Sequence, residues 1–323
     1  MTDQAADKPK PASAFTLEAN ARVADALSLD DLDFERASRG LLATHETGKI
    51  THKHGTAWDV SRYDFIRNNV EPPESVNPSL WRQARLNSNH GLFEVADGMW
   101  QARGYDISNI TFLRGDTGWV IIDPLTTEAT AAACLELANA TLGHRDVRAV
   151  IYTHSHADHF GGVEGVTSHD AVRNGEVRVI APEGFLREAV SENVIAGPAM
   201  ARRAAYQFGP LLPPGPRGHV DSGLGQAIPT APSGLIAPTE DITHTGQQLT
   251  VDGIRIVFQM TPEAEAPAEM NFFFPDRGGC AWPRTAATTC TIWFRFAVPK
   301  FVTRSTGPST STKRSSCLVQ KPN

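Results

Sequence analysis

Residues 153–162 read Thr153-His154-Ser155-His156-Ala157-Asp158-His159-Phe160-Gly161-Gly162, directly after the apolar run Val147–Tyr152, which is predicted to be a buried strand. Three imidazoles and one carboxylate within six residues are hard to explain as packing, because each polar group would need its own partner near the strand end. A bound metal ion supplies a partner for all of them. The stretch therefore predicts a metal site.

The spacing within this stretch suggests two ion positions. His154 and His156 are two residues apart, so they project the same way if strand geometry continues, and can bind one ion. Asp158 and His159 follow on the turn and can reach a second ion. We expect the glycine pair at 161–162 to let the backbone pass close to the site as a helix begins.

Composition sets the limits of the class. The 323 residues are 41% hydrophobic and 20% charged, which suffices for a buried core and excludes collagen-like, coiled-coil and wholly disordered chains. No window approaches the roughly 18 consecutive apolar residues of a membrane span, and the polar start lacks a signal peptide, so we expect a soluble, cytoplasmic protein. The net charge of -6 gives no overall basic footprint for nucleic acid.

The order of predicted elements indicates an α/β or α+β layered domain. Hairpins are predicted from Gly91–Val95 with Met99–Arg103, from Ile110–Arg114 with Trp119–Asp123, and from Leu249–Val251 with Ile254–Met260. A further strand is predicted over Val177–Ala181, and helices over Leu17–Leu29, Asp31–Leu42, Thr126–Leu142 and Pro182–Val194.

The residues alone do not decide the role of two further segments. His45, His52 and His54 cluster in sequence, but we interpret them as solvated residues of an extended segment rather than as a metal site. The proline- and glycine-rich residues 209–234 form a predicted long loop, which either covers a site or is an inert connector.

The pattern His-x-His-x-Asp-His after a strand, preceded by Trp119-Val-Ile-Ile-Asp123-Pro, resembles the metallo-β-lactamase superfamily. The resemblance implies an αββα sandwich with a dinuclear metal site at one edge of its two sheets. It also implies that Asp123 supports the metal ligands without binding the ion itself. The alternative is that Asp123 only caps the strand end before Pro124.

The region after the last hairpin narrows the resemblance. Most superfamily members carry Pro-Gly-His-Thr-Pro-Gly there, whereas this chain has Thr261-Pro-Glu263-Ala-Glu265-Ala-Pro-Ala-Glu269-Met-Asn271, without a histidine. This sequence is similar to that of the alkyl sulfatases, which hydrolyse dodecyl sulfate and related surfactants. The similarity covers roughly residues 58–277 and implies by position that Glu265 is the carboxylate ligand, with Glu263 and Glu269 as neighbours.

The alkyl sulfatase resemblance implies zinc-dependent hydrolysis of primary alkyl sulfates, such as dodecyl sulfate, to alcohol and sulfate, with attack at carbon and C–O cleavage. Two zinc ions would activate water and neutralise the leaving sulfate, the first held by His154, His156 and Glu265, the second by Asp158 and His159. Asp158 is also expected to act catalytically by orienting the water. Substrate-contact residues are not identified; apolar residues near Tyr206, Phe208, Leu211 and Leu212 could receive an alkyl chain or pack in the core.

The end of the chain differs in kind from the rest. All acidic residues lie at or before Asp276, so residues 277–323 carry a charge of +8 and the preceding part -14. Three of the four cysteines are also there: Cys280, Cys290 and Cys317. The alkyl sulfatase motif Met-Ala-Glu-Asn, whose Glu is a metal ligand, is missing here. Arg284 or its neighbours occupy that place, and no further His ligand follows.

We therefore hypothesise a reading-frame shift near Gly278–Cys280. With freely chosen codons, Ala281–Thr303 read two bases later can yield Met-Ala-Glu-Asn and end in Arg-Gly-Ala-Glu-Val-Arg-Asp. The expected organisation is then a leader (1–57), a partial catalytic domain (58–277) and an aberrant, disordered basic tail (278–323), without the homodimerisation region of the family. The alternatives are a genuine basic tail that binds an anionic partner, a non-catalytic fragment with a partial metal site, or another ester or thioester hydrolase of the same fold.

Overall fold

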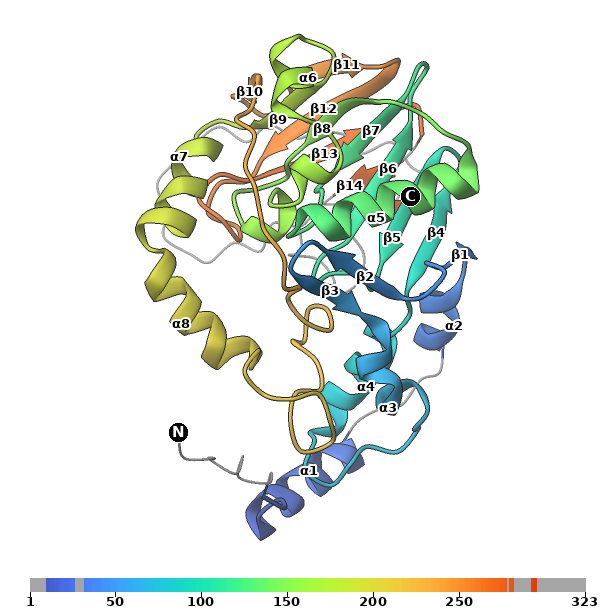
Figure 1. Cartoon of the computed structure of the whole chain (residues 1–323), viewed down its shortest axis with the longest axis vertical. Helices are drawn as coiled ribbons and strands as arrows, with labels where there is room; N and C mark the ends of the chain where they lie inside the picture. Colours follow the sequence, from blue (N-terminus) through green and yellow to red (C-terminus); the bar gives the residue numbers. More distant parts are fainter. Residues whose placement is uncertain (1–9, 27–31, 278, 282–291, 295–323) are drawn as a thin grey trace, which may run out of the picture.

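The computed structural model describes residues 10–26, 32–277, 279–281 and 292–294. In this part of the chain two sheets pack face to face, and helices cover the outer face of the larger one (Figure 1). The strands of the larger sheet are, in spatial order, β1 (Leu41–Ala43), β4 (Gly91–Ala96), β5 (Met99–Arg103), β6 (Ile110–Arg114), β7 (Trp119–Ile122), β8 (Val147–Ile151), β9 (Arg178–Pro182) and β10 (Glu240–Ile242). Pairing is antiparallel from β1 to β7 and parallel from β7 to β10.

The smaller sheet is antiparallel throughout its described strands. They are β11 (Gln248–Val251), β12 (Ile254–Met260), β13 (Met270–Phe274), β14 (Gly279–Ala281) and β15 (Ile292–Phe294). A separate hairpin is formed by β2 (Lys49–His52) and β3 (Gly55–Asp59).

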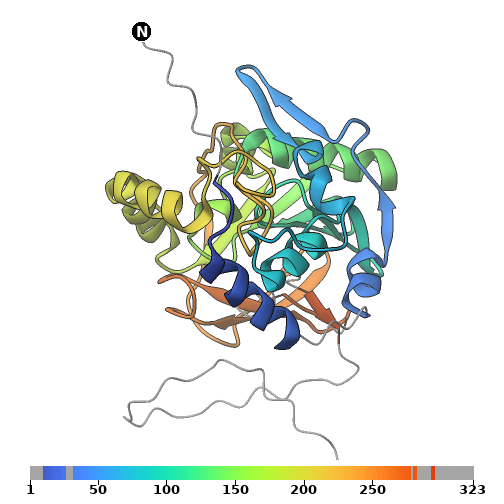
Figure 2. The same cartoon turned by 90° about the horizontal axis from the view of Figure 1, so that it is seen from below.

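The helices lie mainly on the outer side of the larger sheet and, in the view of Figure 1, below it. They are α1 (Ala14–Ala26), α2 (Leu32–Ser38), α3 (Asp64–Arg67), α4 (Pro78–Asn87), α5 (Glu128–Leu142), α6 (His169–Arg173), α7 (Phe185–Val190) and α8 (Gly197–Phe208). Figure 2 shows α5 and the smaller sheet on opposite sides of the larger sheet, with α8 projecting away from both.

Two apolar cores explain the layers. On β7, Trp119 and Ile121 face the core under α5, whereas Val120 and Ile122 face the core between the sheets. Because both faces of this strand are covered, its sequence is a continuous run of apolar residues and does not alternate between apolar and polar. The three predicted hairpins and the predicted strands at β8 and β9 are confirmed. These layers form the α–β–β part of the αββα sandwich expected from the resemblance.

The helix predicted over Asp31–Leu42 is wrong at its end. The helix α2 stops at Ser38, and Leu41–Ala43 pairs with β4 as the edge strand β1. Gly40 causes the change, because its φ of +82° and the close approach of Glu94 O, 2.3 Å from where a Cβ would lie, turn the chain onto the sheet edge.

The helix predicted over Pro182–Val194 is interrupted. Pro182 ends strand β9, and α7 begins only after Gly184, which has a φ of +83°. After Val190 the chain makes a π-helical turn, Ser191–Ile195, and continues into α8, a helix that the sequence analysis missed.

The first 57 residues contribute to the sheet, since β1 belongs to it and the expected boundary at residue 57 lies inside strand β3. Most of the predicted aberrant tail, 278–323, lies outside the described residues. Within the described part of the chain, no helix has both the length and the apolar character needed to cross a membrane.

Candidate metal centre

The histidine-rich turn and Asp123 lie at one edge of the larger sheet. Strands β7 and β8 are parallel neighbours, so their carboxyl ends meet, and Asp123 follows β7 as the turn follows β8. This edge is where ligands bind in parallel sheets. Asp123 has a φ of 53°, a conformation that non-glycine residues rarely adopt and that is frequent at functional sites.

Three predicted ligands form one donor group. His154 Nε2 lies 3.0 Å from His156 Nδ1, and His156 Nδ1 lies 3.6 Å from Glu265 Oε1. All three donor atoms lie within 4.8 Å of one another. Bonds of about 2.0–2.1 Å to a tetrahedral zinc ion place neighbouring donors about 3.3 Å apart. The two imidazoles and the carboxylate therefore fit a single zinc ion.

Asp123 fixes the orientation of two imidazoles. Its Oδ1 accepts a hydrogen bond from Thr153 N, and its Oδ2 accepts from Thr153 Oγ1 and from His159 Nδ1, each at 2.8 Å. Because the Thr153 hydroxyl donates to Asp123, its oxygen is left to accept from His154 Nδ1, also 2.8 Å away. The proton of each of these two imidazoles is thereby held on Nδ1, and Nε2 is left for a metal ion.

Asp158 and His159 form a second pair of donors. His159 Nε2 lies 3.3 Å from Asp158 Oδ2, and the ring centroid of His159 is 4.1 Å from that of His154. The structure thus places the second pair beside the first group. Ser108 Oγ donates to the backbone carbonyl of Asp158 at 2.5 Å, which anchors this part of the turn.

The expected helix after the glycine pair is absent from the described residues 157–165. Short 3-10 turns, Ala157–His159 and Val163–Gly165, take its place. Gly161 and Gly162 lie against the backbone of the segment after Asp123: a Cβ at either would come within 2.2 Å of a carbonyl oxygen there. The pair therefore docks the histidine-rich turn onto that segment, which supports the expected close approach but not the expected helix.

The pKa shifts follow from the crowding of acids around the imidazoles. Burial alone would lower the pKa of His159, but Asp158 and Asp123 outweigh it and raise this pKa to about 10. Burial also acts to lower the pKa of His156, but the carboxylates of Glu265, Asp158 and Glu192 outweigh the effect of burial. The pKa of His156 is therefore raised as well. A metal ion at these nitrogens displaces the protons, so binding is coupled to proton release.

Two acidic residues of the site were not assigned a role from the sequence. Glu269 is fully buried, and its Oε2 accepts hydrogen bonds from the backbone N–H groups of Glu265 and Ala266 at 2.6 and 2.9 Å, so it shapes the loop that carries the ligand. Burial raises the pKa of Glu269. Glu192 lies beside His156 and was not singled out at all.

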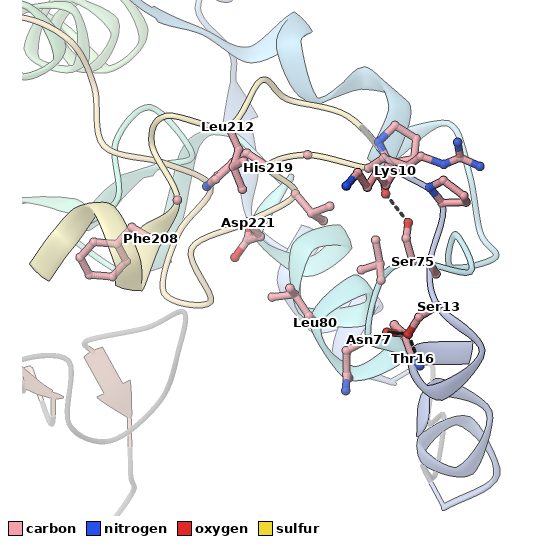
Figure 3. Close-up of a pocket in the computed structure, with 18 of the residues that line it drawn as sticks. Lys10, Ser13, Thr16, Ser75, Asn77, Leu80, Phe208, Leu212, His219 and Asp221 are labelled. Atoms are coloured by element: carbon pink, nitrogen blue, oxygen red, sulfur yellow. Dashed lines mark hydrogen bonds between the residues drawn. The ribbon is translucent and has the colours of Figure 1, made fainter. Parts of the chain in front are cut away.

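The long loop 209–234 borders a pocket (Figure 3), and the residues that line this pocket do not include the histidine-rich turn. Phe208, Leu212, His219 and Asp221 are among the residues that line it, and Tyr63 Oη lies 2.9 Å from His219 Nδ1. Of the apolar residues considered for an alkyl chain or for the core, Tyr206 and Leu211 are not in the core, being 94% and 86% exposed. His45, His52 and His54 are not part of any metal-binding group found among the described residues.

Comparison with known proteins identifies relatives of this chain. Residues 103–258 match the family model of the metallo-beta-lactamase superfamily. The chain is 46% identical over 264 residues to an alkyl/aryl-sulfatase of Saccharomyces cerevisiae, an alignment that covers 81% of this chain and 41% of the relative. It is 44% identical over 275 residues to a linear primary-alkylsulfatase of Pseudomonas sp., with 84% and 41% covered.

A solved structure, that of a stereoselective inverting sec-alkylsulfatase from Pseudomonas sp., superposes with a TM-score of 0.79 at 45% identity and covers 83% of this chain and 42% of that one. The chain thus spans about two fifths of the length of these relatives. The region that matches the family model includes Asp123 and the whole histidine-rich turn. We conclude that this chain contains a metallo-β-lactamase domain and has alkylsulfatases as its homologues.

Proposed function

We propose that this chain carries the metal-binding site of an alkyl sulfate ester hydrolase, which converts an alkyl sulfate and water into an alcohol and hydrogen sulfate. The single observation that carries the proposal is the convergence of His154 Nε2, His156 Nδ1 and Glu265 Oε1, from segments more than 100 residues apart, on one position. Homology to proteins named alkylsulfatases supports the sulfate ester as the substrate class.

The donor set suits zinc. His154, His156 and Glu265 would hold one ion, and Asp158 and His159 would contribute to a second. When bound, zinc supplies Lewis-acid charge that stabilises a leaving sulfate and lowers the pKa of water. In this proposal two ions act together, as the adjacent donor pair suggests.

The residues of the chain have separate tasks. Asp158, whose side chain is 16% exposed, is the group that would orient the attacking water and accept its proton. Asp123, at 4% side-chain exposure, would hold His154 and His159 in their metal-binding tautomers through the hydrogen bonds described above.

The preferred substrate within the class is a primary alkyl sulfate such as dodecyl sulfate. A linear primary-alkylsulfatase and an (R)-specific secondary-alkylsulfatase are 44% and 45% identical to this chain, so identity alone does not separate the two. A panel of dodecyl sulfate and 2-octyl sulfate separates them directly.

The test is hydrolysis by the purified chain after zinc loading, measured as release of inorganic sulfate. Turnover that is lost in Asp158→Ala and retained in the exposed control Asp170→Ala supports the proposal. Turnover of lactones or acyl thioesters in preference to sulfate esters would replace it with another hydrolase of the same fold.

A second candidate function is metal binding without catalysis. Among the described residues, the second ion position has only Asp158 and His159 as donors, whereas the first has three. Zinc content measured together with sulfate release separates the two functions: binding of one ion per chain without turnover identifies the non-catalytic form.

A further inference from the structure

The side chain of Glu192 lies beside His156, one of the proposed metal ligands, and has no part in the proposed function. It belongs to the π-helical turn Ser191–Ile195, which joins α7 to α8. Its Oε2 lies 3.9 Å from Nε2 of His156, and both side chains are 26% exposed. A carboxylate that faces an imidazole in a mostly buried position has a stronger interaction than one on the open surface.

Packing of α7 directs Glu192 toward the site. Phe185 and Ala189 lie seven and three residues before it, so all three share the inner side of the helix, and the first two are 1% exposed. Phe185 stacks on Tyr152 with ring centroids 4.8 Å apart, and Tyr152 lies two residues before His154. The stripe that packs α7 onto the end of β8 therefore continues into Glu192.

The turn that carries Glu192 has an unusual backbone. Ala196 N donates to Ser191 O at 2.9 Å, which is the five-residue bond of a π-helix, and Asn193 Nδ2 donates to Ala189 O at 2.9 Å. Such turns are rare and occur frequently at functional sites.

The two ring nitrogens of His156 have different surroundings. Nδ1 lies in the donor group, 3.0 Å from His154 Nε2 and 3.6 Å from Glu265 Oε1. Nε2 faces Glu192 instead. A histidine that binds a metal through one nitrogen commonly donates the proton of the other to a carboxylate, which fixes its tautomer and strengthens it as a ligand.

We propose that Glu192 is a positioning residue of the metal centre: its carboxylate, 3.9 Å from Nε2 of His156, attracts the proton on that nitrogen and so holds Nδ1 toward the ion. The inference rests on the proposed metal site. According to this inference, metal affinity depends on the α7–α8 turn as well as on the turn after β8.

The experiment compares zinc affinity of the full chain, measured by competition with a chromogenic chelator, in the wild type, Glu192→Gln, Glu192→Ala and Glu188→Gln. Glu188 is the matched control, because it lies on α7 and its carboxylate pairs with Arg187 rather than with a histidine. We expect about 10- to 100-fold weaker binding in both Glu192 variants and none of this loss in the control. Glutamine keeps the size of the side chain, so a role in packing alone leaves its affinity unchanged.

A second readout follows the proton itself. In ¹⁵N–¹H spectra of the zinc-loaded wild type, His156 should show a metal-bound Nδ1 and a protonated Nε2 in slow exchange with water, and Glu192→Gln should accelerate that exchange. Equal zinc affinity and equal exchange in the wild type and Glu192→Gln would overturn the inference while leaving the proposed function intact. A wild-type chain that binds no zinc refutes the proposed function instead.

Discussion

The substitution Asp123→Asn tests how the sheet edge prepares the site. The aspartate accepts three hydrogen bonds at 2.8 Å, two from Thr153 and one from His159 Nδ1. An asparagine of the same shape has one accepting oxygen and one NH₂ group, which can only donate. If the oxygen keeps the Thr153 backbone N–H, the NH₂ group faces His159 Nδ1.

That contact forces a change of tautomer. To accept from the new NH₂ group, His159 must move its proton from Nδ1 to Nε2, the nitrogen that lies 3.3 Å from Asp158 and would bind the ion. Loss of such an orienting partner weakens metal binding by about 10- to 100-fold, which is about 1.4 to 2.7 kcal/mol. Replacing a charge-assisted hydrogen bond in this buried place also costs about 1.5–3 kcal/mol of folding stability.

The assay is zinc competition titration of Asp123→Asn beside Asp146→Asn, an exposed aspartate just before the start of β8. Unfolding of the metal-free proteins by urea measures the stability term separately. If Asp123→Asn binds zinc as tightly as the wild type, the hydrogen bonds that Asp123 accepts do not orient the imidazoles for the metal, and the capping alternative for this residue regains support.

Zinc at about 100 times its Kd should raise the Tm by about 5–10 °C through preferential binding to the folded chain, and His154→Ala should abolish this rise; a rise that persists in the variant contradicts the ligand assignment. Hydrolysis of dodecyl sulfate in H₂¹⁸O should place the label in the alcohol, since attack at carbon breaks the C–O bond; label in the sulfate means attack at sulfur. Burial raises the pKa of Asp221 to about 7 from 3.8, so its contribution to stability is complete below pH 4 and is lost as the pH rises through 7, by up to about 4 kcal/mol. Asp221→Asn should remove that dependence in urea titrations at pH 4 and pH 8, and an unchanged dependence assigns it to other groups. The frame-shift hypothesis predicts a second reading frame encoding Met-Ala-Glu-Asn over codons 270–323, and a gene without it rejects the hypothesis.

Much of the site could be predicted because its donors are grouped along the chain. Three imidazoles and Asp158 lie on one turn after a strand, and Asp123 ends the neighbouring strand. Glu265 is more than 100 residues away, and only the resemblance to a family identified it. Nothing in the local sequence shows which carboxylates meet the turn in space.

The missed residues follow from the same limit. Glu192 sits on a π-helical turn, whose geometry the helical pattern of Pro182–Val194 does not reveal. Once the helix is placed correctly, the sequence does hold a hint of its role: Glu192 is an acidic residue on the same helical stripe as the apolar Phe185 and Ala189. Likewise, β1 and β10 have three residues each, too few for a periodic pattern, and their pairing depends on the rest of the sheet.

The burial of the acidic groups divides their tasks at the site. The most buried acids, Asp123 and Glu269, fix the two segments that meet at the site. Both oxygens of Asp123 accept hydrogen bonds, from Thr153 and His159, and Oε2 of Glu269 accepts two from backbone N–H groups. Asp158 and Glu265 keep side-chain exposures of 16% and 21% and face the imidazole nitrogens. Burying a carboxylate is costly unless it is paired, and these acids, with Glu192, outnumber the three imidazoles. In the metal-free chain the raised pKa of His159 offsets part of the negative charge with a proton. A divalent cation offsets more of it, and this excess of carboxylates is the electrostatic reason to expect one at this edge of the sheet.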